Sequence, residues 1–528
     1  MAISVFKRSF VSAFCVFFIG FVLRLVAWSN TMVINPDGAL FIHQARAIYS
    51  GQTDTLFCAI NYLPNLSLLI AGSYWLFHDW VFAARCVSFL FGFATLVPIY
   101  LLLKRFFAEP IVSLGTLVFA VLPVFVGSSV DIIRDPISWF FASLGLYWFT
   151  VGMESKLRWY FALSSLSLMM AAWARIEASV LIVFSLLFLS HHVMQKKEQA
   201  LSRLACFFMP VITLAVSGLV AVLATKGLSG LGILLENAFT GILSSPFSHY
   251  RTMSDKLATL AFQNRYDSLG FFLAEARKNL WLVALGSVLN RCLEAFFFFF
   301  FIVCGIGFIT AIRRSFGDQR MKYFVSVSCG LVILLYLHTF RSWYIDYRHV
   351  CLLIISTSVF VGFGIDRMRQ FIQNRISTRQ NLITIVMALV IVALPLPKDL
   401  KPRDADKRVF KEIGEFLADR EGAAKFIPIA TSCSSYRLIS FYANLGYHGA
   451  PCPVESEATC WEYFSDSFEH FMENVRASSI KYFVWSEKLW PGGSASVFET
   501  PFSLHLKELR RWHHPDTGEM ILYEVTDQ

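Results

Sequence analysis

Residues 80–103 read WVFAARCVSFLFGFATLVPIYLLL, a run of 24 residues with one charged side chain, Arg85. About 20 apolar residues in helical conformation are enough to cross the hydrocarbon core of a bilayer. Two cations, Lys104 and Arg105, follow the run directly, as is typical of the cytoplasmic end of a membrane span. The run therefore predicts a transmembrane helix and indicates the fold class of the chain.

The composition extends this interpretation to most of the chain. Of the 528 residues, 56% are apolar and 16% are charged, whereas soluble domains contain roughly 25% charged residues. The mean hydropathy is +0.56, and the 53 phenylalanines exclude a disordered, collagen-like or coiled-coil chain. The apolar runs predict an all-α polytopic bundle of about eleven transmembrane helices, near residues 10–29, 80–103, 110–129, 136–152, 159–174, 178–193, 205–225, 293–312, 321–339, 349–365 and 380–397.

The distribution of cations predicts the orientation of this bundle. The short connections on one side of the spans contain seventeen Lys and Arg residues, and those on the other side contain five. By the positive-inside rule, the N-terminus is cytoplasmic and the C-terminus extracytoplasmic. The first span is expected to be retained, because it holds Arg24 and lacks a small-residue cleavage site before Trp28. The apolar stretch 66–77 is too short to cross and is expected at the membrane interface.

Two domains are predicted. Residues 1–398 form the transmembrane domain, with interfacial helices in its outer loops 30–79 and 226–292, and residues 399–528 form a small periplasmic α/β domain. Residues 1–398 have a net charge of +15, whereas the tail has 14 basic and 20 acidic residues. The positive charge thus belongs to the membrane part, and no nucleic-acid partner is expected. In the tail we expect an amphipathic helix at 409–417 and strands at 425–430, 480–485 and 520–525.

Short motifs exclude several kinds of site. The sequence has no Cys-x-x-Cys pattern, no GxGxxG, no P-loop and no GxSxG elbow, so a nucleotide-binding catalyst is not expected. Cys452 and Cys460 are one candidate disulfide pair in the tail, and buried free thiols are an equal alternative.

The charged residues within or beside the predicted spans gather at the outer membrane face, which favours a site there. The tetrapeptide Asn35-Pro36-Asp37-Gly38 follows the first span and precedes a helical pattern at 39–49. A carboxylate near a helix N-terminus stays ionised and is able to accept a proton from an incoming hydroxyl. Asp37 is therefore a candidate general base, with simple helix capping as the alternative.

A second acidic motif, Asp131-Ile132-Ile133-Arg134-Asp135-Pro136, opens the fourth predicted span. Asp135 is expected either to cap that helix, with Pro136 in the first turn, or to face Asp37 across the bundle. In the second case the two carboxylates would flank the substrate or hold a divalent metal ion such as Mg²⁺ or Mn²⁺.

Arginines of the outer half of the membrane are the third candidate group. A guanidinium pairs well with a lipid phosphate and would neutralise charge on a departing phosphate. The candidate phosphate ligands are Arg85, Arg134, Arg348 and His349. The alternative for each arginine is a structural pair, such as Arg175 with Glu177, or a snorkelling side chain.

The order of these motifs resembles that of the GT-C fold glycosyltransferases that use polyprenyl-phosphate sugars. The resemblance covers roughly residues 10–365 and rests on Asp37, Asn61-Tyr62-Leu63-Pro64, Phe82-Ala83-Ala84-Arg85, Lys104-Arg105, Asp135 and Tyr347-Arg348-His349. The most similar groups are the lipopolysaccharide-core galacturonosyltransferases, the lipid A aminoarabinose transferases and the protein O-mannosyltransferases.

The resemblance implies an enzyme of the bacterial inner membrane that transfers one sugar from a polyprenyl-phosphate carrier to an acceptor at the outer leaflet. It implies that Asp37 is the general base and Asp135 the second acidic residue of the site. In-line attack at the anomeric carbon predicts inversion of configuration. The acceptor stays open among a lipid, a glycan and a protein.

Three other functions compete with this hypothesis. A secondary transporter would carry polar residues near the bilayer midplane on repeated, broken helices, and the sequence has neither feature. An O-antigen ligase or polymerase would use a diphosphate-linked donor. A sensor or assembly protein would act through the tail.

Overall fold

The computed structural model describes residues 2–58, 60–217, 245–375, 380–431, 433–450, 475, 479–488 and 506–526. Two compact units divide the chain. Unit 1 contains residues 1–23, 91–128 and 135–399, and unit 2 contains residues 24–90, 129–134 and 400–528. The sequence-based boundary after residue 398 stays a prediction.

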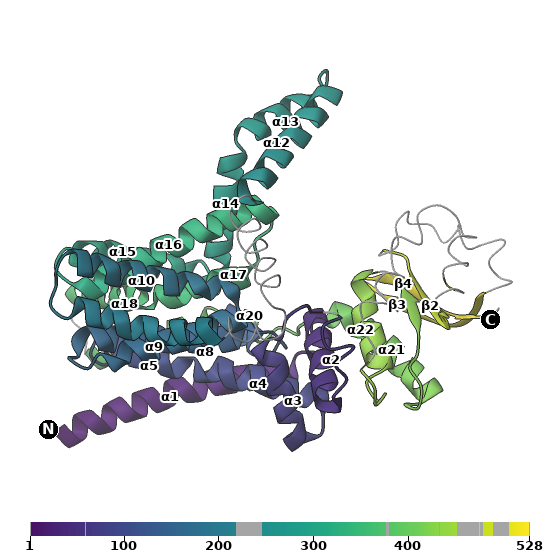
Figure 1. Cartoon of the computed structure of the whole chain (residues 1–528), viewed down its shortest axis with the longest axis horizontal. Helices are drawn as coiled ribbons and strands as arrows, with labels where there is room; N and C mark the ends of the chain where they lie inside the picture. The colour runs from purple at the N-terminus through teal and green to yellow at the C-terminus, as the bar shows by residue number, and fades with distance from the viewer. Residues whose placement is uncertain are drawn as a thin grey trace. The chain divides into compact units, whose positions relative to one another are not determined.

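Unit 1 is a helical bundle (Figure 1). It takes in most of α1 (Ala2–Ser29) and a helix over Ala200–Ser217. Its other helices are α5 (Leu96–Leu103), α6 (Ile111–Val121), α7 (Pro123–Ser128), α8 (Asp135–Glu154), α9 (Trp159–Ala174), α10 (Ser179–Met194), α12 (Ser245–Gln263), α13 (Ser268–Lys278), α14 (Leu280–Ala295), α15 (Phe299–Ser315), α16 (Gln319–Ser342), α17 (Tyr347–Ser356), α18 (Ser358–Arg375), α19 (Gln380–Ala393) and α20 (Leu396–Asp399).

Among the described residues, six helices are long and apolar enough to cross a membrane. Two bent pairs raise the number to eight: α14 with α15, bent by 106°, and α17 with α18, bent by 68°. Several of the other predicted spans are present as shorter or interrupted helices. The span expected at 110–129, for example, is divided between α6 and α7 because Pro123 holds Leu122 in the extended conformation. The all-α polytopic fold is confirmed.

Close backbone contacts hold the bundle together where glycines face a neighbouring helix. A Cβ atom on Gly307 of α15 would lie 1.7 Å from the carbonyl oxygen of Phe360, and one on Gly364 of α18 would lie 2.0 Å from that of Val303. Only glycine allows α15 and α18 to approach so closely, as in other membrane helix pairs. Beyond this packed region, α12 and α13 form a hairpin that projects from the bundle (Figure 1).

Unit 2 combines the loop that follows α1 with the tail. Its helices in the loop are α2 (Pro36–Ser50), α3 (Asn65–Phe77) and most of α4 (Trp80–Ala94), and those in the tail are α21 (Arg408–Glu421) and α22 (Cys433–Ala443). The strands are β1 (Ile429–Thr431), β2 (Tyr482–Ser486), β3 (Leu506–His514) and β4 (Gly518–Val525). Their order is β1-β2-β4-β3, with β1 and β2 parallel and the other pairs antiparallel.

The tail confirms the predicted α/β class. The apolar positions Val409, Phe410, Ile413 and Leu417 of α21 are buried, as the amphipathic pattern requires. The strands expected at 480–485 and 520–525 are present as β2 and β4, whereas the one expected at 425–430 is shorter and begins only at Ile429, and β3 is not predicted. Its sequence, LKELRRWHH, is mostly polar and partly exposed, as is common in edge strands.

Backbone and side-chain contacts join the tail to the loop after α1 and to residue 131 within unit 2. Thr31 and Arg403 form an isolated β-bridge, and the Arg403 guanidinium lies 2.8 Å from a carboxylate oxygen of Asp131. The Ile34 amide donates a hydrogen bond of 3.0 Å to the Tyr442 hydroxyl. Cys58 in the same loop is disulfide-bonded, whereas the proposed Cys452–Cys460 pair lies outside the described residues. The loop and the tail therefore fold as one body.

Candidate active site

Asp37 lies in the first turn of α2, as the sequence predicts. Pro36 begins the helix, and Asn35 occupies the capping position without a capping hydrogen bond. The Asn35 side chain instead binds the segment 129–134: its Nδ2 donates to the Ile132 carbonyl at 3.3 Å, and its Oδ1 accepts from the Ile132 amide at 2.8 Å. Asp37 is thus not the helix cap, and its carboxylate is left for other interactions.

The backbone around Asp37 is tightly packed. A Cβ atom on Gly38 would lie 2.9 Å from the Ile132 Cβ atom, so no larger residue fits without movement. The Asp37 side chain nevertheless remains 49% exposed, and one of its oxygens lies 3.8 Å from Nη1 of Arg437. A rigidly held, accessible carboxylate is well suited to proton transfer.

We expect Asn35→Ala to loosen this arrangement. The substitution removes both hydrogen bonds to Ile132 and leaves the buried Ile132 backbone groups unpaired, at a cost of about 1–3 kcal/mol. Thermal unfolding of the purified protein measures this loss of stability. Asn61→Ala, in an exposed position of the same outer loop, is the control. Equal melting temperatures for the two variants would show that the hydrogen bonds between Asn35 and Ile132 do not stabilise the protein.

Arg134 stacks beside the same part of α2. Its guanidinium lies 5.6 Å from the ring centre of Phe41 and 5.3 Å from that of Tyr62, and it donates to the Tyr62 hydroxyl. Phe41 is one helical turn beyond Asp37. Arg134 therefore lies against α2, the helix that carries the candidate base.

Arg85 has unused hydrogen-bonding capacity. Its guanidinium lies 5.9 Å from the ring centre of Trp28, and its Nη2 is 3.4 Å from the Thr31 carbonyl oxygen. Its Nε is buried and has no hydrogen-bond partner among the described residues. Burying a donor without a partner costs free energy, so an anionic oxygen is a fitting ligand for this group.

Asp135, in unit 1, has a different environment from that of Asp37. Its side chain is 3% exposed and lies 3.1 Å from Arg175. Arg175 also lies 3.1 Å from Glu177, so the expected Arg175–Glu177 pair is part of a larger buried group. Because Asp135 and Asp37 belong to different units, their convergence on one cavity stays a prediction.

Arg348 and His349 lie at the start of α17. Arg348 Nε is 3.3 Å from Asp346, and the His349 ring accepts a hydrogen bond of 3.1 Å from the Asp346 amide. His349 also lines a cavity of about 50 Å³ with Glu177 and His338. The contacts with Asp346 hold both side chains in place, and their role as phosphate ligands stays a prediction.

The metal hypothesis has little support from the arrangement of these residues. Among the described residues, no group of three or more His, Cys, Asp or Glu side chains is able to hold a metal ion. Asp37 and Asp135 each have an arginine partner, and such a cation competes directly with a metal. A metal ion held by Asp37 and Asp135 together stays a prediction, because the two carboxylates belong to different units, and no catalytic step is assigned to a metal.

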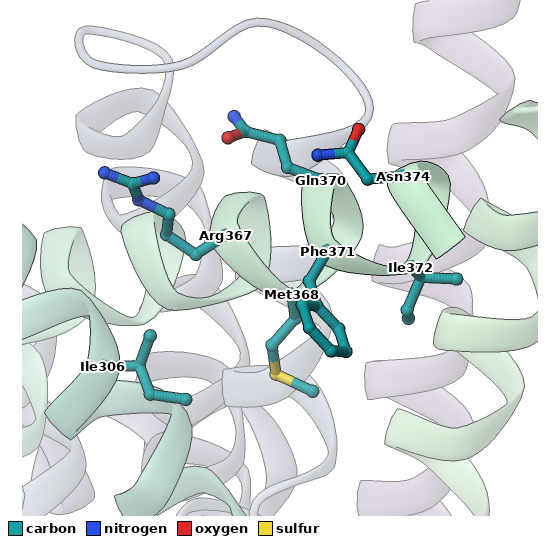
Figure 2. A pocket seen from close by; sticks show the side chains of 7 residues that line it. All are labelled: Ile306, Arg367, Met368, Gln370, Phe371, Ile372 and Asn374. Atoms are coloured by element: carbon teal, nitrogen blue, oxygen red, sulfur yellow. The ribbon is translucent and has the colours of Figure 1, made fainter. Parts of the chain in front are cut away.

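A separate cavity lies between α15 and α18 in unit 1 (Figure 2). Its volume is about 470 Å³, and its lining includes Ile306, Arg367, Gln370 and Asn374. Its lining residues in the described part of the chain include no carboxylate, so none of them is a candidate base. Sequence reasoning missed Arg437, the partner of Asp37, since the two residues are 400 positions apart and share no motif.

No protein-family model and no curated protein match this chain. Several solved structures, however, are similar to this chain. ArnT from Cupriavidus metallidurans bound to undecaprenyl phosphate has a TM-score of 0.57 and 12% identity, over 96% of each chain. The oligosaccharyltransferase from Archaeoglobus fulgidus with Zn and sulfate has a TM-score of 0.57 and 11% identity, over 95% of this chain and 72% of that one. The oligosaccharyltransferase AglB from the same organism, with an inhibitory peptide and a dolichol-phosphate, has a TM-score of 0.54 and 10% identity, over 98% of this chain and 74% of that one.

These likenesses extend over nearly the whole length of the chain, so they include the bundle and the tail together. They agree with the helical bundle and the small C-terminal sheet described above. The chain therefore has the GT-C fold, the fold of these membrane glycosyltransferases.

Proposed function

We propose that this chain is an integral-membrane glycosyltransferase that moves one sugar from a polyprenyl-phosphate carrier to an acceptor hydroxyl at the outer leaflet, with inversion. The observation that carries the proposal is Asp37, an accessible carboxylate on a rigid backbone directly beyond the first membrane helix. The fold adds support, because ArnT, which has the same fold, binds undecaprenyl phosphate.

In this reaction Asp37 accepts the proton of the acceptor hydroxyl. The hydroxyl oxygen forms a bond to the anomeric carbon as the bond from that carbon to the phosphate oxygen breaks. The polyprenyl phosphate leaves with the bonding electron pair, and an arginine stabilises its charge. Arg85 is the best candidate for that task because its buried Nε lacks a partner among the described residues.

The proposed function is tested by following the transfer of a radiolabelled sugar. Purified protein is incubated with radiolabelled polyprenyl-phosphate sugars and membrane extracts, and the products are separated. We expect label in a product that is absent when no protein is added. Label that stays in the donor with every sugar offered would contradict the proposal.

Removal of divalent metal ions is expected to change the transfer rate by less than about twofold. The reason is that Asp37 and Asp135 both have arginine partners, so neither needs a metal to balance its charge. The rate is measured after dialysis against EDTA and again after addition of Mg²⁺, Mn²⁺ or Zn²⁺. A loss of rate that one of these ions restores would assign a metal to the reaction.

A further inference from the structure

Another cavity lies in unit 2, at the far end of α2 from Asp37. Its volume is about 400 Å³, and its walls are the end of α2, the junction of α3 and α4, and residues 445–448 of the tail. Nothing in the proposed transfer reaction uses this cavity. Its lining combines aromatic rings with polar side chains, which is the usual composition of a small-molecule site.

Three aromatic rings form one wall of the cavity. Tyr74 and Trp80 are stacked, with ring centres 3.6 Å apart and an angle of 5° between the ring planes. Tyr49 meets both rings edge-on, at 4.9 Å from Tyr74 and 5.7 Å from Trp80. These mutual contacts fix the rings in place, so that little side-chain entropy is lost when a ligand binds.

The polar groups of the cavity are also held in place. One carboxylate oxygen of Asp79 accepts a hydrogen bond of 2.8 Å from the Phe82 amide at the start of α4. A carboxylate has two oxygens and several acceptor positions, so it is able to bind a ligand hydroxyl at the same time. His78 and His448 line the same cavity, and imidazoles both donate and accept hydrogen bonds.

This combination matches the chemistry of a sugar. A pyranose ring has a face of C–H groups that packs on aromatic rings and a rim of hydroxyls that bind carboxylate and imidazole groups. We propose that Tyr49, Tyr74 and Trp80, together with Asp79, form a carbohydrate-binding subsite. A simple interfacial belt of aromatic residues would not require the carboxylate or the covering tail segment.

The subsite is connected to the candidate base along α2. A cavity of about 40 Å³ lies between the two and is lined by His43, Arg46 and Arg437, among others. Arg46 also lines the larger cavity, and Arg437 is the partner of Asp37. Burial lowers the pKa of His43 to about 4, so its imidazole is neutral at physiological pH.

The distance along the helix indicates what the subsite would bind. Asp37 and Tyr49 are twelve residues apart, which corresponds to about 18 Å along a helix. A sugar in the subsite is therefore too far from Asp37 to be the transferred sugar or to carry the reacting hydroxyl. We assign it to another part of the acceptor molecule. Resting on the proposed transfer function, this inference names the acceptor class: a glycan, or a lipid that carries one.

Binding is tested without any donor. Purified full-length protein in lipid nanodiscs is applied to a glycan array that contains hexoses, hexosamines and uronic acids, and the affinity for the strongest binder is measured by calorimetry. We expect binding, and we expect Tyr74→Ala and Trp80→Ala each to weaken it by about tenfold or more. Trp75→Ala is the matched control, because Trp75 is next to Tyr74 but 73% exposed and not part of the cavity wall.

Two results would overturn the subsite: no binding to any glycan of the array, or equal affinities for the three variants, as a membrane-interface belt predicts. If an alanine variant does not fold, Asp79→Asn replaces it, because asparagine also caps a helix; an unchanged affinity would then count against the subsite. A protein that binds glycans but transfers no label refutes the proposed transfer function alone. A protein that transfers label with an unchanged acceptor KM in Tyr74→Ala refutes the subsite alone.

Discussion

The Asp37→Asn protein is expected to transfer sugar roughly 10²–10⁴-fold more slowly than the wild type. General base catalysis contributes roughly 10²–10⁴-fold to a rate, and an amide cannot accept the proton of the acceptor hydroxyl. The substitution keeps the size of a side chain that is 49% exposed, and the ion pair that it removes, with Arg437, is itself partly exposed, so the fold is expected to remain. Initial rates at saturating donor measure the effect.

Asp54→Asn is the matched control for that experiment. Asp54 is an exposed carboxylate of the same outer loop, and it accepts a hydrogen bond only from the neighbouring Thr53 among the contacts described for it. We expect wild-type rates for this variant. Equal activity of the two asparagine variants would remove Asp37 from the mechanism and leave the fold assignment unchanged.

The Arg175→Ala protein is expected to lose about 3–5 kcal/mol of stability. Arg175 lies between Asp135 and Glu177, and its removal leaves the almost fully buried Asp135 carboxylate without its cation. The cost is large because a charge in a low-dielectric environment needs a partner. Thermal unfolding in detergent, followed by the loss of monodisperse protein, measures the effect.

Two further variants test whether the loss of stability in Arg175→Ala comes from the unpaired Asp135 carboxylate. Arg341→Ala removes an arginine that is exposed at the end of α16, and we expect it to change stability by less than about 0.5 kcal/mol. The double variant Arg175→Gln with Asp135→Asn removes both charges and is expected to recover part of the loss. If Arg175→Ala melts like the wild type, the buried ion group does not stabilise unit 1.

The features that the sequence predicts correctly are those with a local signal. The apolar runs predict the bundle, the repeat of Val409, Phe410, Ile413 and Leu417 predicts α21, and the tetrapeptide around Asp37 predicts the start of α2. Each of these depends on residues within a few helical turns of one another. The fold class and the position of the candidate base follow from such signals.

The features that the sequence does not reveal depend on contacts between distant segments. The hydrogen bonds between Asn35 and Ile132 join residues 97 positions apart, and the ion pair between Asp37 and Arg437 joins residues 400 positions apart. No pattern in the sequence marks the partner in either case. The edge strand β3 was missed for another reason, since its polar sequence lacks the alternation of a half-buried strand.

The contacts of Thr31, Ile34 and Asp131 with the tail bear on how the protein is made. Because residues 24–90 and 400–528 belong to one unit, residues 24–90 cannot complete their contacts until residues 400–528 have been synthesised. The nascent polypeptide must thread every intervening helix into the bilayer during that interval. Assembly of the candidate site therefore follows synthesis of the intervening helices, and under the proposed function a chain that stalls on the ribosome before residues 400–450 emerge would transfer no sugar.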